Sequence, residues 1–165
     1  MLDEARTFAL AAHDGQKYGD RPYSCHLEAV VELLAPYGTQ AQIIGYLHDV
    51  VEDTPIDERE IRDRFGPLIA DCVDLLTDAP GNSRAERKAR TYQRLEAVSG
   101  AAELALVVKT ADRLANVRAC AADDSRRLWE VYRREHAAFR RAAYRQGLCE
   151  PLWRELDGLL EGEHS

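Results

Sequence analysis

The amino-acid sequence predicts an all-α fold, a helical bundle of about eight or nine helices. Apolar residues recur at spacings of three and four along most of the chain, which is the period of a helix. Proline and glycine fall mostly between these periodic segments, where they end helices. No segment alternates apolar and polar residues with the two-residue period of a strand.

We expect three helices in the N-terminal third. They cover residues 2–13, 24–34 and 39–53. A loop at residues 15–22 separates the first two, and Ser24 and Thr39 stand where they can cap the second and third. The third helix should end near Asp53, because Thr54 precedes a proline and is pushed out of helical geometry.

Six further helices complete the prediction. They cover residues 57–65, 67–77, 83–98, 102–119, 125–146 and 151–160. Asp57 with Glu60 three positions later matches a capping box at the start of the first. The chain of 165 residues is long enough to bury a core without a disulfide or metal staple, and we expect one domain over residues 1–165.

Composition excludes several classes of protein. The chain is 45% hydrophobic and 31% charged, which is ordinary for a soluble folded protein. No apolar run reaches the ~18 residues of a membrane span, and the acidic start is unlike a signal peptide. The four cysteines lie far apart without a Cys-x-x-Cys pair, so we expect reduced thiols and a cytoplasmic protein.

Charge is uneven along the chain. The formal net charge is −7, with −10 on residues 1–80 and +3 on residues 81–165. Such an acidic chain is a poor candidate for nucleic-acid binding, which depends on neutralising phosphates with Lys and Arg. Seven acids lie between Asp49 and Asp63. They predict either a solvated helix face or a site for a hard cation.

The first candidate site is the segment His48-Asp49-Val50-Val51-Glu52-Asp53. On a helix, His48 lies beside Glu52 and Asp49 beside Asp53, so four titratable groups form one patch. Carboxylates at the C-terminal end of a helix also oppose its dipole. A divalent cation held by His48 and Asp49 would relieve this repulsion; the alternative is an exposed helix end with solvated acids.

The second candidate lies in residues 104–117, which are apolar nearly all round and predict a central, buried helix. Lys109, Asp112, Arg113 and Asn116 fall on one face at i, i+3, i+4 and i+7. Because unpaired buried charge is costly, this stripe must face a wet pocket or bonded partners. The stripe offers a carboxylate that can bind a metal ion, and two cations and an amide that suit phosphate or base contact. The alternative is an internal Lys-Asp-Arg salt-bridge network.

The third candidate is His26, which opens an apolar helix; a lone histidine in such a position is more often structural than a metal ligand. The loop before it carries Lys17 and Tyr18. The adjacent Cys25 is discounted as a ligand, because neighbouring helix residues point about 100° apart. The remaining histidines, which we expect to be structural or on the surface, are His13, His136 and His164.

Taken in order, these segments resemble the HD-domain metal-dependent phosphohydrolases. The likeness is to the hydrolase domain of the RelA/SpoT alarmone enzymes and to their stand-alone small relatives of the Mesh1 type. The segments that carry it are His13-Asp14-Gly15-Gln16, Pro22-Tyr23-Ser24-Cys25-His26, His48-Asp49-Val50-Val51-Glu52-Asp53-Thr54, Phe65-Gly66 with Val73-Asp74-Leu75-Leu76-Thr77, and Lys109-Thr110-Ala111-Asp112-Arg113-Leu114-Ala115-Asn116-Val117-Arg118.

The resemblance implies an HD-domain bundle that removes the 3′-pyrophosphate of ppGpp and pppGpp. It implies a divalent metal ion, usually Mn²⁺, and no synthetase or regulatory domain within these residues. The implied metal ligands are His26, His48, Asp49 and Asp112. The implied acid/base pair is Glu52 and Asp53. The implied substrate-binding residues are Lys17, Tyr18, Lys109, Arg113 and Asn116, with Asn116 at the nucleotide sugar.

Two departures from the family pattern stand out: the first leaves the substrate open, and the second concerns the local start of a helix. Lys17-Tyr18 stands where the family commonly has Arg-Lys, and Leu27 where it has proline. Because Tyr18 can stack on a purine, an adenine alarmone such as ppApp, or NADPH, is an alternative substrate. A further alternative is an inactive domain that senses nucleotides. The expected partner is a small phosphorylated nucleotide, with no nucleic acid and no membrane; a homo-oligomer stays open.

Overall fold

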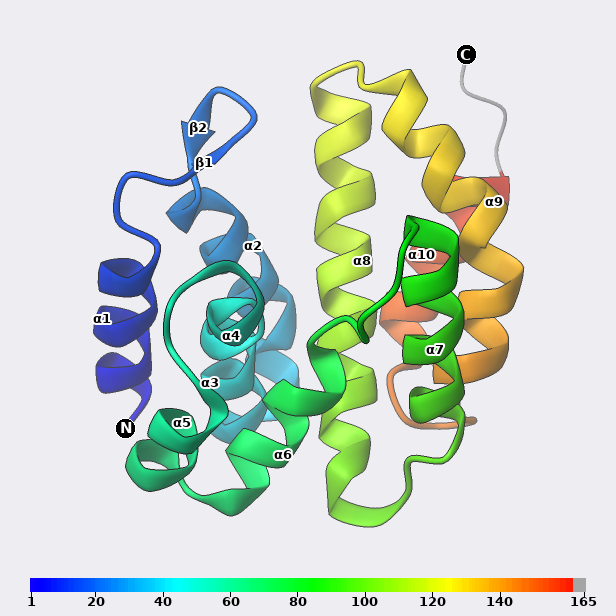
Figure 1. Ribbon diagram of the computed structural model, residues 1–165. Helices are drawn as coiled ribbons and strands as arrows, with labels where there is room; N and C mark the ends of the chain where they lie inside the picture. Colours follow the sequence, from blue (N-terminus) through cyan, green and yellow to red (C-terminus); the bar gives the residue numbers. More distant parts are fainter. Residues whose placement is uncertain (162–165) are drawn as a thin grey trace.

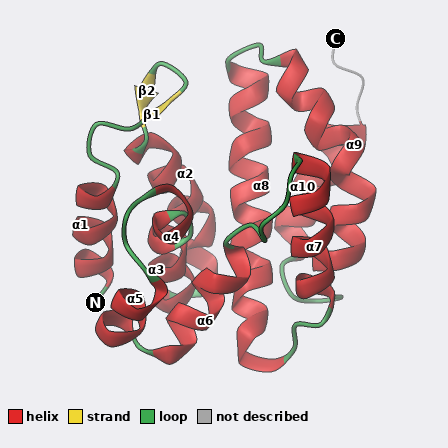
Figure 2. Ribbon diagram, viewed as in Figure 1, coloured by secondary structure: helices red, strands yellow, loops and turns green. Residues whose placement is uncertain are grey.

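The computed structural model of the protein describes residues 1–161 and is almost entirely helical (Figures 1 and 2). This part of the chain contains ten α-helices, two short 3-10 helices and one two-stranded sheet. The all-α prediction is therefore confirmed. His164 lies outside the described residues.

The α-helices are α1 (Leu2–Ala12), α2 (Ser24–Leu34), α3 (Thr39–Leu47), α4 (Val50–Asp53), α5 (Glu58–Phe65), α6 (Pro67–Leu76), α7 (Arg84–Glu96), α8 (Leu104–Ala122), α9 (Arg126–Ala143) and α10 (Glu150–Glu161). The 3-10 helices are η1 (Ala35–Tyr37) and η2 (Gly100–Glu103). Every predicted helix except the third corresponds to one α-helix, with ends that differ by three residues or fewer.

The third predicted helix is wrong as one continuous element. The helix expected over residues 39–53 is interrupted at His48 and Asp49, which separate α3 from α4. Asp49 has φ −105° and ψ −1°, well away from the ideal α-helical angles of about −63° and −42°. Neither glycine nor proline stands at this break, so nothing in the local sequence announces it. The predicted end is confirmed, since Thr54 is extended with φ −133° and ψ 170°.

The predicted caps have mixed outcomes. Helices α2 and α3 begin at Ser24 and Thr39 themselves, so neither residue occupies the N-cap position expected for it. Asp57 does cap α5, because its carboxylate accepts a 2.9 Å hydrogen bond from the backbone N–H of Glu60. This bond satisfies one of the donors that the first turn of a helix leaves free.

The predicted loop at residues 15–22 contains a small hairpin. Strands β1 (Lys17–Tyr18) and β2 (Arg21–Pro22) pair antiparallel, with Tyr18 opposite Arg21. Two residues are too few to show strand alternation in the sequence. Arg21 also forms a 2.8 Å ion pair with Asp123, which ties the hairpin to the C-terminal end of α8.

Helix α8 lies at the centre of the molecule, as its apolar sequence predicts. Figure 1 shows it between the N-terminal helices α1–α6 and the group α7, α9 and α10, and it packs against α2, α3, α6, α9 and α10. Leu106, Val108 and Leu114 are fully buried on it. Because α8 touches both groups of helices, polar side chains on it can meet residues from distant parts of the sequence.

Helices α2 and α3 pack closely through Gly45. A Cβ atom at this position would lie 2.5 Å from Leu34 Cδ1, so a larger residue would force the two helices apart. This close approach brings His26 at the start of α2 near His48 at the end of α3.

No helix in the described chain combines the length and apolar character that crossing a membrane requires. All four cysteines are free, with Cys25 exposed and Cys72, Cys120 and Cys149 buried.

Candidate functional site

Four side chains from separate segments converge where α2, the α3–α4 break and α8 meet. The Nε2 atoms of His26 and His48 lie 3.4 Å apart. Asp49 Oδ2 lies 2.8 Å from His48 Nε2 and 3.9 Å from His26 Nε2. Asp112 Oδ1 lies 3.2 Å from His26 Nε2 and 3.5 Å from His48 Nε2. The two imidazoles and two carboxylates singled out in the sequence therefore face one point.

The break between α3 and α4 explains how neighbouring residues contribute to the same point. In a continuous helix, the side chains of His48 and Asp49 would diverge by about 100°. At the break, where the Asp49 backbone departs from ideal helical angles, its carboxylate lies 2.8 Å from His48 Nε2. His26 and His48 are 3% and 0% exposed, so both imidazoles are held in the protein interior.

Surrounding hydrogen bonds fix the orientation of these groups. His48 Nδ1 lies 2.7 Å from the carbonyl oxygen of Gly45, so Nδ1 carries a proton and donates to that oxygen, and Nε2 faces the cluster. The hydroxyl of Tyr23 donates to Asp49 Oδ2. The side-chain amide of Asn116 donates to Asp112 Oδ1 at 2.7 Å. Outer contacts of this kind orient metal ligands in proteins.

The charges in the cluster are strongly coupled. Burial disfavours the charged imidazole of His48, but Asp49 and Asp112 outweigh that effect and raise its pKa well above the ordinary value. Burial likewise opposes ionisation of Asp112, whose pKa is nevertheless lowered by His26, His48 and Lys109. Both carboxylates are thus held ionised by positive charge close to them.

The donor set fits a divalent cation. His26, His48 and Asp49 each offer one donor atom within 4.8 Å of the others, and Asp112 adds a second carboxylate. Imidazole nitrogen together with carboxylate oxygen suits first-row divalent ions. Four side chains of this kind could hold such an ion and would leave room beside it for water and substrate.

Glu52 and Asp53 lie in α4, next to the cluster, and both residues are exposed. The carboxyl group of Glu52 is nevertheless partly shielded from water, and this desolvation raises its pKa. Burial and the nearby charge of Asp49 raise the pKa of Asp53. Carboxyl groups with raised pKa values beside a polar cluster are candidates for proton transfer. The backbone N–H of Asp78 donates a 3.0 Å hydrogen bond to Glu52 Oε2.

Lys109 reaches from α8 toward the cluster but is also bonded to the backbone. Its Nζ donates to the carbonyl of Leu76 at 3.0 Å and lies 3.8 Å from Asp112 Oδ2. The lysine is 6% exposed. Burial opposes its charge, yet Asp112 and Asp49 outweigh that effect and raise the pKa of Lys109. Lys109 therefore carries a fixed positive charge beside the cluster.

Arg113 points away from the cluster, into an internal network between α7, α8 and α9. Its guanidinium donates to Glu135 Oε2 at 3.0 Å and to the Tyr92 hydroxyl at 2.9 Å. The rings of Tyr132 and Phe139 each lie 4.7 Å from its Cζ. Arg113 is therefore held in a salt bridge, but its acid partner is Glu135 on α9 and not Asp112 of the same stripe, as the Lys-Asp-Arg alternative expected.

The β1–β2 hairpin covers one side of the cluster. The ring of Tyr18 stacks on His26, with centroids 4.8 Å apart and an interplanar angle of 17°. Its hydroxyl donates to Asn116 Oδ1 at 2.7 Å. The hairpin thus places Tyr18 against the cluster, while the preceding residue, Lys17, has an exposed side chain.

His13, expected to be structural or on the surface, lies beside this site in a supporting position. It is buried and stacks on Tyr23, with centroids 4.6 Å apart. Its Nδ1 lies 2.8 Å from Gln16 Oε1, and Gln16 Nε2 donates to the backbone oxygen of Asp53 at 2.9 Å. The motif His13-Asp14-Gly15-Gln16 is visible in the sequence, but the contacts that link it to α4 are seen only in the structure.

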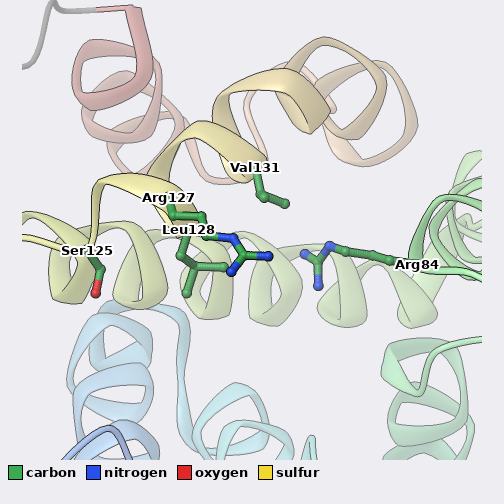
Figure 3. A pocket seen from close by; sticks show the side chains of 5 residues that line it. All are labelled: Arg84, Ser125, Arg127, Leu128 and Val131. Carbon is green, nitrogen blue, oxygen red and sulfur yellow. The ribbon is translucent and has the colours of Figure 1, made fainter.

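A surface hollow of about 370 Å³ lies between α7 and the N-terminal part of α9. Figure 3 shows the guanidinium groups of Arg84 and Arg127 pointing toward each other across it. Arg84 also donates to Glu135 Oε1 at 2.7 Å. The hollow is therefore the outer end of the network that holds Arg113.

Comparison with known proteins identifies the family. The chain matches the HD domain family over residues 5–149. It is 34% identical over 125 residues to the MESH1 guanosine-3′,5′-bis(diphosphate) 3′-pyrophosphohydrolase of Danio rerio, covering 72% of this chain and 68% of that protein.

A longer relative matches more of this chain. The chain is 33% identical over 157 residues to a probable guanosine-3′,5′-bis(diphosphate) 3′-pyrophosphohydrolase of Synechocystis. The match covers 92% of the chain but only 20% of the Synechocystis protein. The chain thus spans about a fifth of that relative's length.

A solved structure supports the same fold. The structure of a metazoan ortholog of SpoT, described as hydrolysing ppGpp, superposes with a TM-score of 0.81 at 24% identity, over 97% of this chain and 93% of that one. The chain belongs to the HD-domain family, in the group that includes the Mesh1-type hydrolases and the longer SpoT-like enzymes.

Proposed function

We propose that this protein hydrolyses the 3′-pyrophosphate of ppGpp and pppGpp, releasing pyrophosphate and leaving GDP or GTP. The observation that carries the proposal is the convergence of four side chains. The Nε2 atoms of His26 and His48 each lie within 3.9 Å of a carboxylate oxygen of Asp49 and of Asp112. The 34% identity to the zebrafish enzyme gives the substrate class.

In this proposal, the four residues hold one divalent cation, and the cation is Mn²⁺. A bound divalent metal ion lowers the pKa of coordinated water and polarises a phosphoryl oxygen. Three hydrogen bonds support it, because they hold the donor atoms in place before the ion binds. His48 Nδ1 donates to the carbonyl of Gly45, the Tyr23 hydroxyl donates to Asp49, and the Asn116 amide donates to Asp112.

Glu52 and Asp53 are proposed to move the proton of the attacking water. Both carboxyl groups have a raised pKa, which brings them nearer to the working pH of a general acid or base. We assign the pair together, because neighbouring carboxylates titrate as a coupled unit.

The remaining site residues are proposed to bind the nucleotide. Lys17 and Tyr18 approach it from the hairpin, and Asn116 contacts the sugar. Lys109 supplies positive charge beside Asp112, while Arg113 supports the site through its own network. We further propose that residues 1–165 act as one hydrolase domain in the cytoplasm; association into a homo-oligomer stays open.

The test is pyrophosphate release from ppGpp by the purified protein with Mn²⁺, with and without a chelator. We expect turnover that the chelator abolishes, and we expect Asp112→Ala to remove it while circular dichroism shows unchanged helicity. Turnover that is unaffected by Asp112→Ala would overturn the proposal.

A second candidate function is the same chemistry on ppApp or NADPH. The observation that favours it is Tyr18, whose ring lies against His26 and offers a stacking surface in place of the family's basic residue. Side-by-side turnover of ppGpp, ppApp and NADPH separates the two. Nucleotide binding without product release would instead indicate an inactive nucleotide sensor.

A further inference from the structure

The segment that follows α6 is held by two neighbouring helices. Lys109 on α8 binds the carbonyl of Leu76 at 3.0 Å. Lys88 on α7 binds the Asp78 carboxylate, with Nζ 2.7 Å from Oδ2 and 2.9 Å from Oδ1. The hydroxyl of Thr91 on α7 accepts from the backbone N–H of Ala79 at 3.0 Å and lies 3.2 Å from Asp78 Oδ1.

The ion pair at the centre of this arrangement is buried. The side chains of Lys88 and Asp78 are 13% and 8% exposed. Burial raises the free energy of a lone charge, so each group depends on the other. A pair enclosed in this way has a defined geometry, unlike the exposed ion pairs elsewhere on α7.

The fixed segment ends on a proposed acid/base residue. The backbone N–H of Asp78 donates to Glu52 Oε2 at 3.0 Å. Glu52 itself is exposed, and this bond is the one that ties its carboxylate to the segment after α6. The position of Asp78 therefore decides where one oxygen of Glu52 lies.

We propose that Lys88 and Asp78 are positioning residues that hold the Glu52 carboxylate in its productive orientation. The proposal rests on the proposed function and deepens it by assigning two residues that act only through Glu52. Misplacing a reacting group by about 1 Å can lower a rate about a hundredfold. Without Lys88 the segment keeps its contacts with Thr91 and Lys109, but the Asp78 carboxylate loses its ion pair and with it a restraint on the direction of the Asp78 N–H.

The activity test is a double-mutant cycle between Lys88→Met and Glu52→Gln. We expect Lys88→Met to lower kcat about tenfold, with KM changed less than about twofold. The conservative variant Lys88→Arg, which keeps the positive charge, should retain most of the wild-type kcat. In a Glu52→Gln background, Lys88→Met should lower kcat no further, because residues that act as a unit are not additive. Independent, multiplying losses would overturn the proposal.

The matched control is Arg94→Met. Arg94 also lies on α7 and also pairs with an acid of α6, Asp74, but it makes no contact with Glu52 among the described interactions. We expect the kcat of Arg94→Met to match that of the wild type.

A second variant serves if Lys88→Met does not fold. The double variant Asp78→Asn/Lys88→Met removes both charges of the pair together and should show the same loss of kcat. A wild-type kcat in this double variant would overturn the proposal.

A readout without turnover separates this inference from the proposed function. Amide hydrogen exchange of Asp78, measured by NMR without nucleotide, should be faster in Lys88→Met than in the wild type, and unchanged in Arg94→Met. Unchanged exchange in Lys88→Met overturns the positioning role even if ppGpp is hydrolysed. Faster exchange together with no ppGpp turnover in the wild type would leave the contact established and the proposed function wrong.

Discussion

The hydroxyl of Tyr18 donates a 2.7 Å hydrogen bond to Asn116 Oδ1, although the two residues are 98 positions apart. Asn116 in turn bonds Asp112 at 2.7 Å. The β1–β2 hairpin is thus connected to the cluster through two successive side chains. A change at Tyr18 therefore alters both the surface offered to a nucleotide and the surroundings of Asp112.

We predict that replacing Lys17-Tyr18 with Arg-Lys shifts selectivity toward guanine. The ratio of kcat/KM for ppGpp to that for ppApp should rise about tenfold, the scale of one changed contact in a binding pocket. Tyr46→Phe is the control, because it removes a hydroxyl that bonds Glu28 away from the hairpin. An unchanged ratio in the hairpin variant would show that these two residues do not select the base.

Tyr23→Phe should weaken binding of the metal ion. It removes the hydroxyl that donates to Asp49 and keeps the ring that stacks on His13. We expect the Kd for Mn²⁺ to rise about tenfold, as for loss of other groups that orient metal ligands. Calorimetric titration measures it. Tyr144→Phe, whose hydroxyl bonds Glu150, should bind Mn²⁺ as the wild type does; equal Kd values for all three proteins would refute the role of Tyr23.

Arg113→Met should destabilise the fold. Arg113 is 4% exposed and bonds both Glu135 and Tyr92, so its loss removes the partner of the Tyr92 hydroxyl and leaves the Glu135 carboxylate with only its pair to Arg84 among the described contacts. We expect the free energy of unfolding in urea to fall by about 3 kcal/mol. Arg118→Met removes the exposed pair with Glu155 and should cost less than about 1 kcal/mol. Equal losses would mean that the buried network adds nothing to stability.

Glu135 should contribute to the loss of stability in acid. Burial opposes its ionisation, but the hydrogen bond from Arg84 and the charge of Arg113 outweigh it, so the pKa of Glu135 is lowered. A lowered pKa gives stability that is complete above the ordinary value of 4.5 and disappears as the pH falls through the folded-state pKa. Between about pH 6 and about pH 3, Glu135→Gln should therefore lose less unfolding free energy than the wild type. Parallel curves would contradict this assignment.

The sequence predicts the helices and the members of the cluster for a clear physical reason. Helical period, proline and glycine are local signals, and they locate almost every element. The stripe on α8 and the acids after His48 also follow from spacing alone. Their convergence does not, because it depends on the break at Asp49, where no glycine or proline marks the change in backbone.

Contacts between distant residues account for what the sequence left undetermined. Arg113 shares the polar stripe of Asp112, yet its partner Glu135 lies 22 positions away on α9, and one sequence cannot reveal that pairing. The same holds for Tyr23 with Asp49 and for Lys88 with Asp78. His13 could not be distinguished from a surface histidine until its stacking on Tyr23 was visible.

The most direct test of the account is the number of Mn²⁺ ions bound per chain, measured by equilibrium titration and metal analysis of the wild type and of Asp112→Ala. Asp112 Oδ1 lies within 3.5 Å of both histidine Nε2 atoms, so the account predicts one tightly bound ion in the wild type and its loss in the variant, with helicity preserved. The same tightly bound ion in both proteins would contradict it.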